Sequence, residues 1–195
     1  MWDKRYATDE FIFGTEPNTF LAAMADRIPP GRVLSLGEGE GRNAVFLAAR
    51  GCSVVAVDAS SVGLAKARRL AEERGVQIET VATDLADFPV LPGEWDAIVS
   101  IFCHPWPGIR ANLYRRCVHG LRPGGVFVLE AYTPAQLRHG TGGPPDKDRL
   151  MTLATLRSEL AGLDFLHAVE LEREVQEGRL HHGLAAVVQV VATRP

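Results

Sequence analysis

The sequence lacks long apolar runs. Its longest purely apolar stretches, such as Ala44–Ala49 and Ala185–Val188, are far shorter than the roughly 18–20 residues that a bilayer-spanning helix needs. The first residues are charged and lack the apolar stretch of a secretory signal. We therefore expect a cytoplasmic protein with no membrane contact.

Cysteine is also scarce. Cys52, Cys103 and Cys117 show neither a disulfide framework nor a zinc-binding spacing, so we interpret them as small buried hydrophobic residues. His181 and His182 form an adjacent pair, but no third ligand stands at a suitable spacing. We predict no metal site and expect both histidines to be exposed.

An excess of charge of one sign is absent as well. The chain has 21 basic and 24 acidic residues, a formal net charge of −3, and so no basic field that would concentrate phosphates. A local cluster of Arg110, Arg115 and Arg116 falls on a predicted surface helix, where a solvated face is the simpler interpretation. We predict no nucleic-acid partner.

The sequence does contain a regular alternation of strand-like and helix-like segments. The 195 residues, 46% of them hydrophobic, suit one globular domain. Short β-branched runs alternate with amphipathic stretches, which predicts an α/β fold with a Rossmann-like, doubly wound and mainly parallel sheet. Strands are expected at 32–36, 53–58, 77–81, 96–101 and 126–131, and helices at 19–25, 43–50, from a cap at Ser60 or Ser61 to Arg74, and from Pro107 to a break at 123–125.

The pattern changes after residue 132. A Gly/Pro-rich loop at 139–146 precedes a short helix near 152–161 and two strand-like stretches, 165–175 and 184–192. Their connection is too short for a parallel crossover, so the two strands must pair antiparallel. We therefore predict a seven-stranded sheet that ends in a hairpin, with an antiparallel C-terminal strand.

A glycine-rich turn, LGEGEGRN at 36–43, follows the first strand. Glycines there let backbone N–H groups and a helix N-terminus approach a ligand closely. A dinucleotide fingerprint needs Gly or Ala where this chain has Arg42, and its third glycine stands one position early, which disfavours NAD. A tight turn that only packs the helix on the strand stays open as an alternative.

Two acidic residues strengthen the ligand interpretation. Asp58 ends the second strand, 21 positions after Gly37, where a carboxylate can accept both ribose hydroxyls of an adenosine. Asp84 follows the third strand and can accept from the adenine amine, while the Leu85 N–H can reach a ring nitrogen. An N-cap role for Asp58 and a turn role for Asp84 are the simpler alternatives. Together with the glycine turn, they indicate an adenosine-containing cofactor.

At these residues the chain resembles the class I S-adenosylmethionine-dependent methyltransferases. The likeness rests on residues 33–58, on Asp84 and on LRPGG at 121–125. The glycine turn together with FGTEPN at 13–18 is similar to the tellurite-resistance and thiopurine methyltransferase-like group. The resemblance implies S-adenosylmethionine as cofactor, with contacts from Gly37, Glu38, Gly39, Asn43, Asp58, Ala59, Asp84, Leu85 and Ser100.

The chain departs from the family pattern at two positions. The family usually has an acidic residue where this chain has Ser35, and a small residue or cysteine where it has Glu38. We hypothesise that Glu38 substitutes for the missing acid by pairing with the α-ammonium of the cofactor. The alternative is that Glu38 crowds the cofactor carboxylate.

The substrate side is expected after the fourth strand. His104 can act as a base for a thiol or hydroxyl, since its reference pKa is near 6.5, or it can be a structural histidine. Trp106 can stack on a planar substrate or cover the sheet edge. By the resemblance, Tyr6 and Phe13 belong to an N-terminal segment that folds over the cofactor, with plain core packing as the alternative.

We expect a single methyltransferase domain over 1–195, with a lid segment at 1–30, a cofactor-binding core at 31–131 and a substrate-side loop, helix and hairpin at 132–195. This leaves little chain for a separate substrate domain and favours a small acceptor, such as a thiol, a heterocycle or a metalloid oxyanion, and a monomer or homodimer. The alternatives are a non-catalytic S-adenosylmethionine-binding module and, less favoured, an NAD-dependent oxidoreductase.

Overall fold

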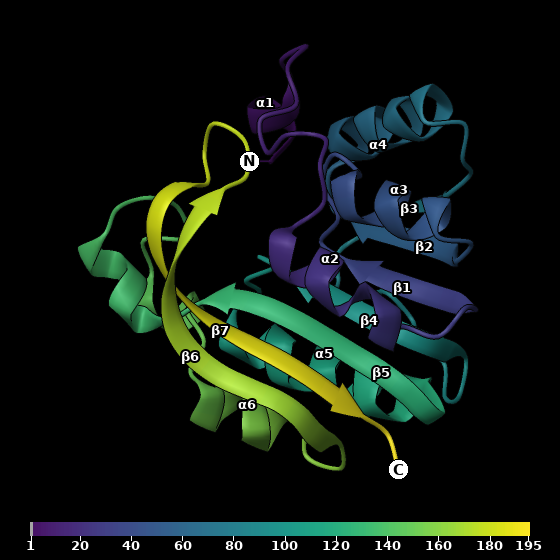
Figure 1. Cartoon of the computed structure of the whole chain (residues 1–195), viewed down its shortest axis with the longest axis vertical. Helices are drawn as coiled ribbons and strands as arrows, with labels where there is room; N and C mark the ends of the chain where they lie inside the picture. Colours follow the sequence, from purple (N-terminus) through teal and green to yellow (C-terminus); the bar gives the residue numbers. More distant parts are fainter. Residues whose placement is uncertain (1) are drawn as a thin grey trace.

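The computed structural model describes residues 2–195, which form one twisted sheet with helices on both faces (Figure 1). The seven strands lie in the order β3-β2-β1-β4-β5-β7-β6. Their bounds are β1 (Arg32–Leu36), β2 (Ser53–Asp58), β3 (Glu79–Ala82), β4 (Trp95–Ile101), β5 (Leu121–Tyr132), β6 (Asp164–Gln176) and β7 (His182–Thr193).

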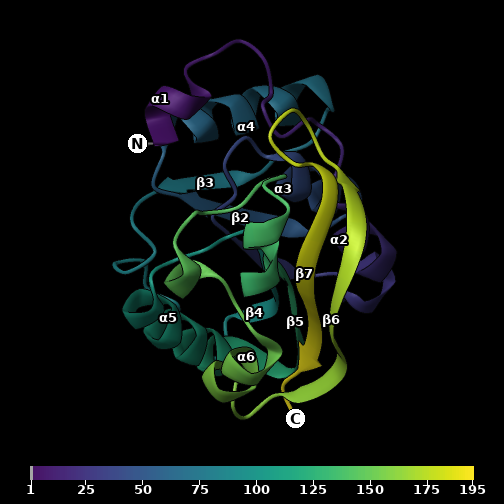
Figure 2. The same cartoon turned by 90° about the vertical axis from the view of Figure 1, so that its left-hand side faces the viewer.

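The predicted sheet topology is confirmed. β1 to β5 pair parallel, whereas β7 runs antiparallel to both of its neighbours, β5 and β6. The two C-terminal strands are long and curved, and they form one wall of the molecule (Figure 2). Their connecting tip reaches the N-terminal segment, where the Arg179 N–H donates to the Ile12 carbonyl at 3.0 Å.

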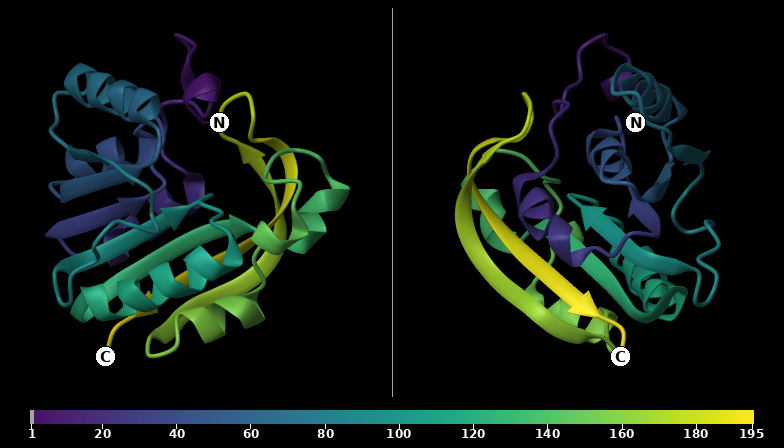
Figure 3. Two further views of the ribbon diagram at one scale, coloured as in Figure 1. Left: turned by 180° about the vertical axis from the view of Figure 1, so that it is seen from behind. Right: turned by 45° about the vertical axis from the view of Figure 1, so that its right-hand side comes forward.

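The helices separate into two layers (Figure 3). Residues of α2, α3 and α4 pack on one face of the sheet, and residues of α5 and α6 pack on the other. Ser60 caps α4 by accepting from the Gly63 N–H. The helices are α1 (Trp2–Tyr6), α2 (Thr19–Met24), α3 (Arg42–Ala49), α4 (Ser61–Glu73), α5 (Pro107–Gly120) and α6 (Leu153–Glu159), with short 3-10 turns at Ala25–Arg27, Pro134–Arg138 and Lys147–Arg149.

The alternation of side chains along each strand divides the core. Leu34 and Ile98 face α5, while the neighbouring residues Val33, Ala97 and Val99 face the opposite helix layer. The central strands are therefore buried on both faces, as a parallel sheet requires. This places the carboxyl ends of β1, β2 and β4 together at one edge.

Three details differ from expectation. β3 begins at Glu79. α5 ends at Gly120 and β5 begins at Leu121, so residues 123–125 do not end the helix and instead lie in a bulge of the strand, where Trp95 pairs with Leu121 and Ala97 with Val126. The solvated-face interpretation is wrong for Arg110, which is buried and holds Glu159 of α6 with two hydrogen bonds of 2.8 and 3.0 Å.

Cys103 and Cys117 are buried and free, as predicted, and Cys52 is half-buried. Within residues 2–195, no helix is long and apolar enough to cross a membrane.

Candidate active site

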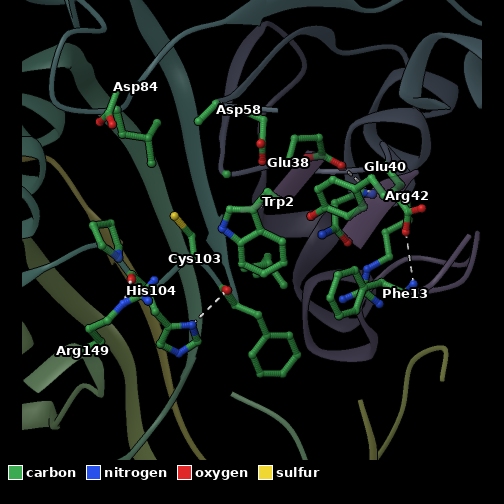
Figure 4. A pocket seen from close by; sticks show the side chains of 18 of the residues that line it. Trp2, Phe13, Glu38, Glu40, Arg42, Asp58, Asp84, Cys103, His104 and Arg149 are labelled. Atoms are coloured by element: carbon green, nitrogen blue, oxygen red, sulfur yellow. Dashed lines mark hydrogen bonds between the residues drawn. The ribbon is translucent and has the colours of Figure 1, made fainter. Parts of the chain in front are cut away.

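A cavity of about 270 Å³ lies beyond the carboxyl ends of β1, β2 and β4 (Figure 4). Its walls come from the N-terminal segment, the glycine turn, the ends of β2 and β3, the loop after β4 and the tip of the β6–β7 hairpin. All the predicted site residues except Gly39 and Ser100 line it. The topology thus brings together side chains that lie more than 170 positions apart in the sequence.

The glycine turn is closely packed. Gly37 and Gly39 have φ values of 63° and 64°, in the left-handed region that favours glycine. A Cβ on Gly37 would lie 2.6 Å from the Cys103 Sγ, and one on Gly39 would lie 2.5 Å from the Tyr6 Oη. Close packing of the turn therefore requires glycine at both positions, and this requirement holds whether or not the turn also binds a ligand. Gly39 lies behind the cavity wall, where its N–H donates to Asp58 at 2.8 Å.

Glu38 closes the first turn of α3. Its Oε1 accepts from the backbone N–H groups of Asn43 and Ala44, both at 3.1 Å, and its Oε2 accepts from the Ser35 hydroxyl. Burial raises the pKa of Glu38, and these three hydrogen bonds oppose the rise. The two departures from the family pattern are thus in direct contact: position 38 provides the acidic group, and the Ser35 hydroxyl donates a hydrogen bond to it.

Asp58 is held by the backbone on both oxygens. Oδ2 accepts from Gly39, and Oδ1 accepts from the Ser60 N–H at 2.7 Å. A carboxylate oxygen can accept two hydrogen bonds, and each Asp58 oxygen accepts one from the backbone, so one position per oxygen is left for a ligand in the cavity. Burial raises the pKa of Asp58, and its hydrogen bonds from Ser60 and Gly39 oppose the rise. Since Ser60 is the N-cap of α4, the N-cap alternative for Asp58 is wrong.

Asp84, Leu85 and Ala59 extend the same side of the cavity. Asp84 Oδ1 accepts from the Ala86 N–H at 2.8 Å, so the turn alternative describes one of its oxygens and leaves Oδ2 for a ligand. In Figure 4, Asp84, Asp58 and Glu38 follow one side of the cavity, and His104 and Arg149 lie opposite them.

The N-terminal segment covers the cavity with aromatic rings. Trp2 stacks on Tyr6 with ring centroids 5.6 Å apart, and Phe13 meets Tyr6 edge-on at 6.3 Å. The Phe13 N–H donates to Glu40 Oε2 at 3.2 Å, and Glu40 is also paired with Lys66 of α4. Sequence reasoning missed Trp2, whose indole lines the cavity (Figure 4). Its i,i+4 spacing from Tyr6 was the available signal.

The loop after β4 begins with a strained residue. Phe102 has a φ of 49°, the one positive value at a non-glycine position in residues 2–195, and such residues concentrate at functional sites. Its ring stacks on Tyr132 with centroids 4.5 Å apart. The turn directs the Cys103 thiol toward Gly37, and burial raises the pKa of that thiol to about 12, so it is neutral at pH 7.

The geometry of His104 contradicts the predicted role as a base. Its Nδ1 lies 2.9 Å from the Phe102 carbonyl, and its Nε2 accepts from the Tyr132 N–H at 2.9 Å. Burial lowers its pKa to about 3. With both ring nitrogens bonded to backbone, no lone pair is free to take a proton, and His104 instead fastens this loop to β5.

The predicted cofactor contact of Ser100 is also wrong. It is buried, and its hydroxyl lies 3.1 Å from the Tyr114 Oη of α5. Side chains alternate along β4, so Ser100 shares the α5 face with Ile98 and does not reach the cavity. Trp106 is half exposed at the cavity mouth, with the Arg149 guanidinium 5.4 Å from its ring.

Two further wall residues were missed as site residues. Arg42, which entered the sequence argument only as a departure from the dinucleotide fingerprint, is buried and pairs with Glu177 Oε2 at 2.7 Å. His181 is buried, which contradicts the expected exposure, whereas its neighbour His182 is exposed as predicted. No group of metal-ligating side chains occurs in the part of the chain that the structure describes.

A buried polar network holds the hairpin tip in place. Asn18 Nδ2 donates to Glu130 at 2.6 Å and to Glu177 at 2.9 Å, and Arg173 donates to both carboxylates. The Asn18 N–H donates to Asn43 Oδ1 at 2.9 Å. The N-terminal segment, α3, β5 and the hairpin are therefore joined around one side of the cavity.

The chain resembles known proteins both in sequence and in structure. Residues 33–125 match the family model of a methyltransferase domain. Trans-aconitate 2-methyltransferase of Methylobacterium nodulans is 30% identical over 157 residues, which cover 75% of this chain and 58% of that protein. The chain therefore contains a methyltransferase domain, and it is similar to S-adenosylmethionine-dependent methyltransferases.

Solved structures share the fold of this chain. TehB from Haemophilus influenzae has a TM-score of 0.74 at 19% identity, covering 100% of this chain and 66% of that one. NodS from Bradyrhizobium japonicum, solved with S-adenosyl-l-homocysteine, has a TM-score of 0.74 at 17% identity, covering 100% and 96%. The chain spans 49–58% of the length of these curated relatives.

The cofactor of this methyltransferase family is S-adenosylmethionine, and the cavity suits it. Asp58 has two acceptor positions left that would suit the ribose hydroxyls, Asp84 and Leu85 line the same cavity and would suit the adenine, and the Glu38 carboxylate in its wall would suit the amino-acid end. These groups would suit the three chemically distinct parts of the cofactor.

Proposed function

We propose that the protein transfers the methyl group of S-adenosylmethionine to a small-molecule acceptor. The observation that carries the proposal is the continuity of one cavity from Asp58 and Asp84 on the β2–β3 side to Phe102 and Trp106 on the β4 side. Cofactor and acceptor can therefore share one space, as an in-line displacement requires.

The chain's own residues would align the reactants and exclude water. When bound, S-adenosylmethionine supplies an electrophilic methyl group on a sulfonium. Trp2, Tyr6 and Phe13 cover the cavity from the N-terminal segment, and Phe102 lines it from the β4 loop. Aromatic faces attract a sulfonium cation, and a dry site lowers the cost of removing its charge during transfer.

No protein base is included in this mechanism. Both nitrogens of His104 are bonded to backbone, and the Cys103 thiol is neutral. Transfer to a nucleophile that arrives ionised, or that is soft, requires alignment more than proton removal. We therefore infer an acceptor that reacts without a general base from the chain.

A small acceptor fits this site better than a macromolecule. The N-terminal segment and the hairpin tip meet over one side of the cavity, and the net charge of −3 offers no attraction for nucleic acid. The relative that acts on trans-aconitate is consistent with an acceptor of this size. A monomer or a homodimer remains our prediction.

A ligand panel tests the proposal. Thermal unfolding is measured with S-adenosylmethionine, S-adenosylhomocysteine and NAD, because a ligand that binds only the native state stabilises it by about 2.7 kcal/mol at 100 times its Kd. We expect stabilisation by the two sulfur compounds and none by NAD. The reverse pattern would favour an oxidoreductase. Binding without transfer of a labelled methyl group to thiols, heterocycles, carboxylates or metalloid oxyanions would favour a non-catalytic binding module.

A further inference from the structure

The wall between the N-terminal segment and the β4 loop contains two buried polar atoms without a partner. Arg42 Nη1 and His181 Nδ1 have no hydrogen-bond partner among residues 2–195. Both side chains line the cavity, and both residues are more than nine-tenths buried. Buried polar groups are almost always hydrogen-bonded, so two such atoms in one cavity wall point to a ligand.

The rest of Arg42 is firmly placed. Its Nη2 pairs with Glu177, and Glu177 also accepts from Arg173 and Asn18. The network has two arginines, Arg42 and Arg173, and two carboxylates, Glu130 and Glu177, so its formal charges are balanced. The free Nη1 is therefore a fixed donor whose orientation costs little when a ligand arrives.

His181 stands beside this donor, between two aromatic rings. Its centroid lies 4.6 Å from that of Phe13 and 4.7 Å from that of Phe102. Burial and the neighbouring Arg42 lower the pKa of His181 to about 3, so the ring is neutral at pH 7. In the tautomer with a proton on Nδ1, it donates one hydrogen bond and presents an aromatic edge.

We propose that Arg42 Nη1 and His181 Nδ1 bind an ionised oxygen group of a planar acceptor, whose ring lies against Phe13 and Phe102. A guanidinium N–H and an imidazole N–H are complementary to a carboxylate or another oxygen anion. This inference rests on the proposed function, and it adds the charge and shape of the acceptor.

The test uses two probes of nearly equal shape, benzoate and benzamide, which differ in charge. Each is titrated by heteronuclear NMR into the full chain saturated with S-adenosylhomocysteine. We expect benzoate to bind at least about tenfold more tightly than benzamide, because hydrogen bonds to a charged group are stronger than those to a neutral one. Equal affinity for the two probes would overturn the proposal.

Variants assign the preference to the two residues. His181→Phe keeps the ring between Phe13 and Phe102 but removes Nδ1, and His182→Phe is the matched control at the exposed neighbour. We expect His181→Phe and Arg42→Met to reduce the benzoate preference severalfold, and His182→Phe to leave it unchanged. A preference retained in His181→Phe overturns the proposal even if Arg42→Met fails to fold.

The cofactor has a carboxylate of its own, which is the competing partner for Arg42. S-adenosylhomocysteine affinity is therefore measured by calorimetry for every variant. We expect changes below twofold. A tenfold loss in Arg42→Met with an intact benzoate preference would assign Nη1 to the cofactor and overturn the subsite. Failure of the wild-type chain to bind S-adenosylhomocysteine would overturn the proposed function itself.

Discussion

Glu38→Gln separates two roles of one buried carboxylate. In the structure, Glu38 caps α3 and lines the cavity, and we propose that it pairs there with the α-ammonium of the cofactor. A glutamine can keep the first role: its Oε1 accepts from the Asn43 and Ala44 N–H groups, and its Nε2 donates to Ser35. It cannot keep the second, because a neutral amide provides no charge for an ammonium.

The expected loss follows from that single contact. A hydrogen bond to a charged partner contributes about 1.5–3 kcal/mol, so S-adenosylhomocysteine should bind roughly 10- to 150-fold more weakly to Glu38→Gln. The fold should not be weakened at pH 7. Burial raises the pKa of Glu38, so its ionisation makes stability decline as pH rises through the titration range of this group. The glutamine variant lacks this decline.

Calorimetry with two ligands measures the effect. 5′-Methylthioadenosine has no amino-acid moiety, so its affinity should be the same in the wild type and in Glu38→Gln. Glu38→Ala serves as a second control, because it also removes the helix cap and should cost about 1–2 kcal/mol of stability. An equal loss for both ligands, or no loss for either, would refute the pairing of Glu38 with the α-ammonium.

Two further predictions concern the β4 loop and the N-terminal segment. His104→Gln should lower the free energy of unfolding by about 1–3 kcal/mol at pH 7, since the buried Tyr132 N–H loses its partner. The folded histidine stays neutral down to about pH 3, whereas the unfolded one protonates near pH 6.5. Wild-type stability therefore falls over that range as the pH drops. Urea unfolding at pH 7, 5 and 4 should therefore show the gap between the two proteins narrowing, and a constant gap would contradict the assignment. S-adenosylhomocysteine should change the tryptophan fluorescence chiefly through Trp2, which lies in the cavity, whereas Trp95 is fully buried. Trp2→Phe should lose most of the signal and Trp106→Phe should retain it; the opposite result would place Trp2 outside the ligand's reach.

Much of the cofactor side was predictable because local signals position it. The bounds of β1 and β2 agree with the sequence patterns, and the carboxyl ends of parallel strands meet at one edge of a sheet. Gly37 and Asp58 therefore come together for any sequence that forms these two strands around a glycine turn. The side-chain alternation of β4 was also readable, and applied to Ser100 it would have excluded that residue from the cavity.

The acceptor side depends on contacts that no local pattern encodes. Hydrophobic periods of 2 and 3.6 residues and turn chemistry specify strands and helices, but not which loops meet across a cavity. His181 is buried only because the curved hairpin brings its tip to Phe13, and the lone pair on His104 Nε2 is occupied only because the Tyr132 N–H of β5 lies beside it. The sequence by itself determined the sheet, the glycine turn and the acidic residues of the cofactor side. Tertiary structure alone decided the roles of both histidines and the pairing of Ser35 with Glu38, since burial and hydrogen bonding depend on neighbours in space.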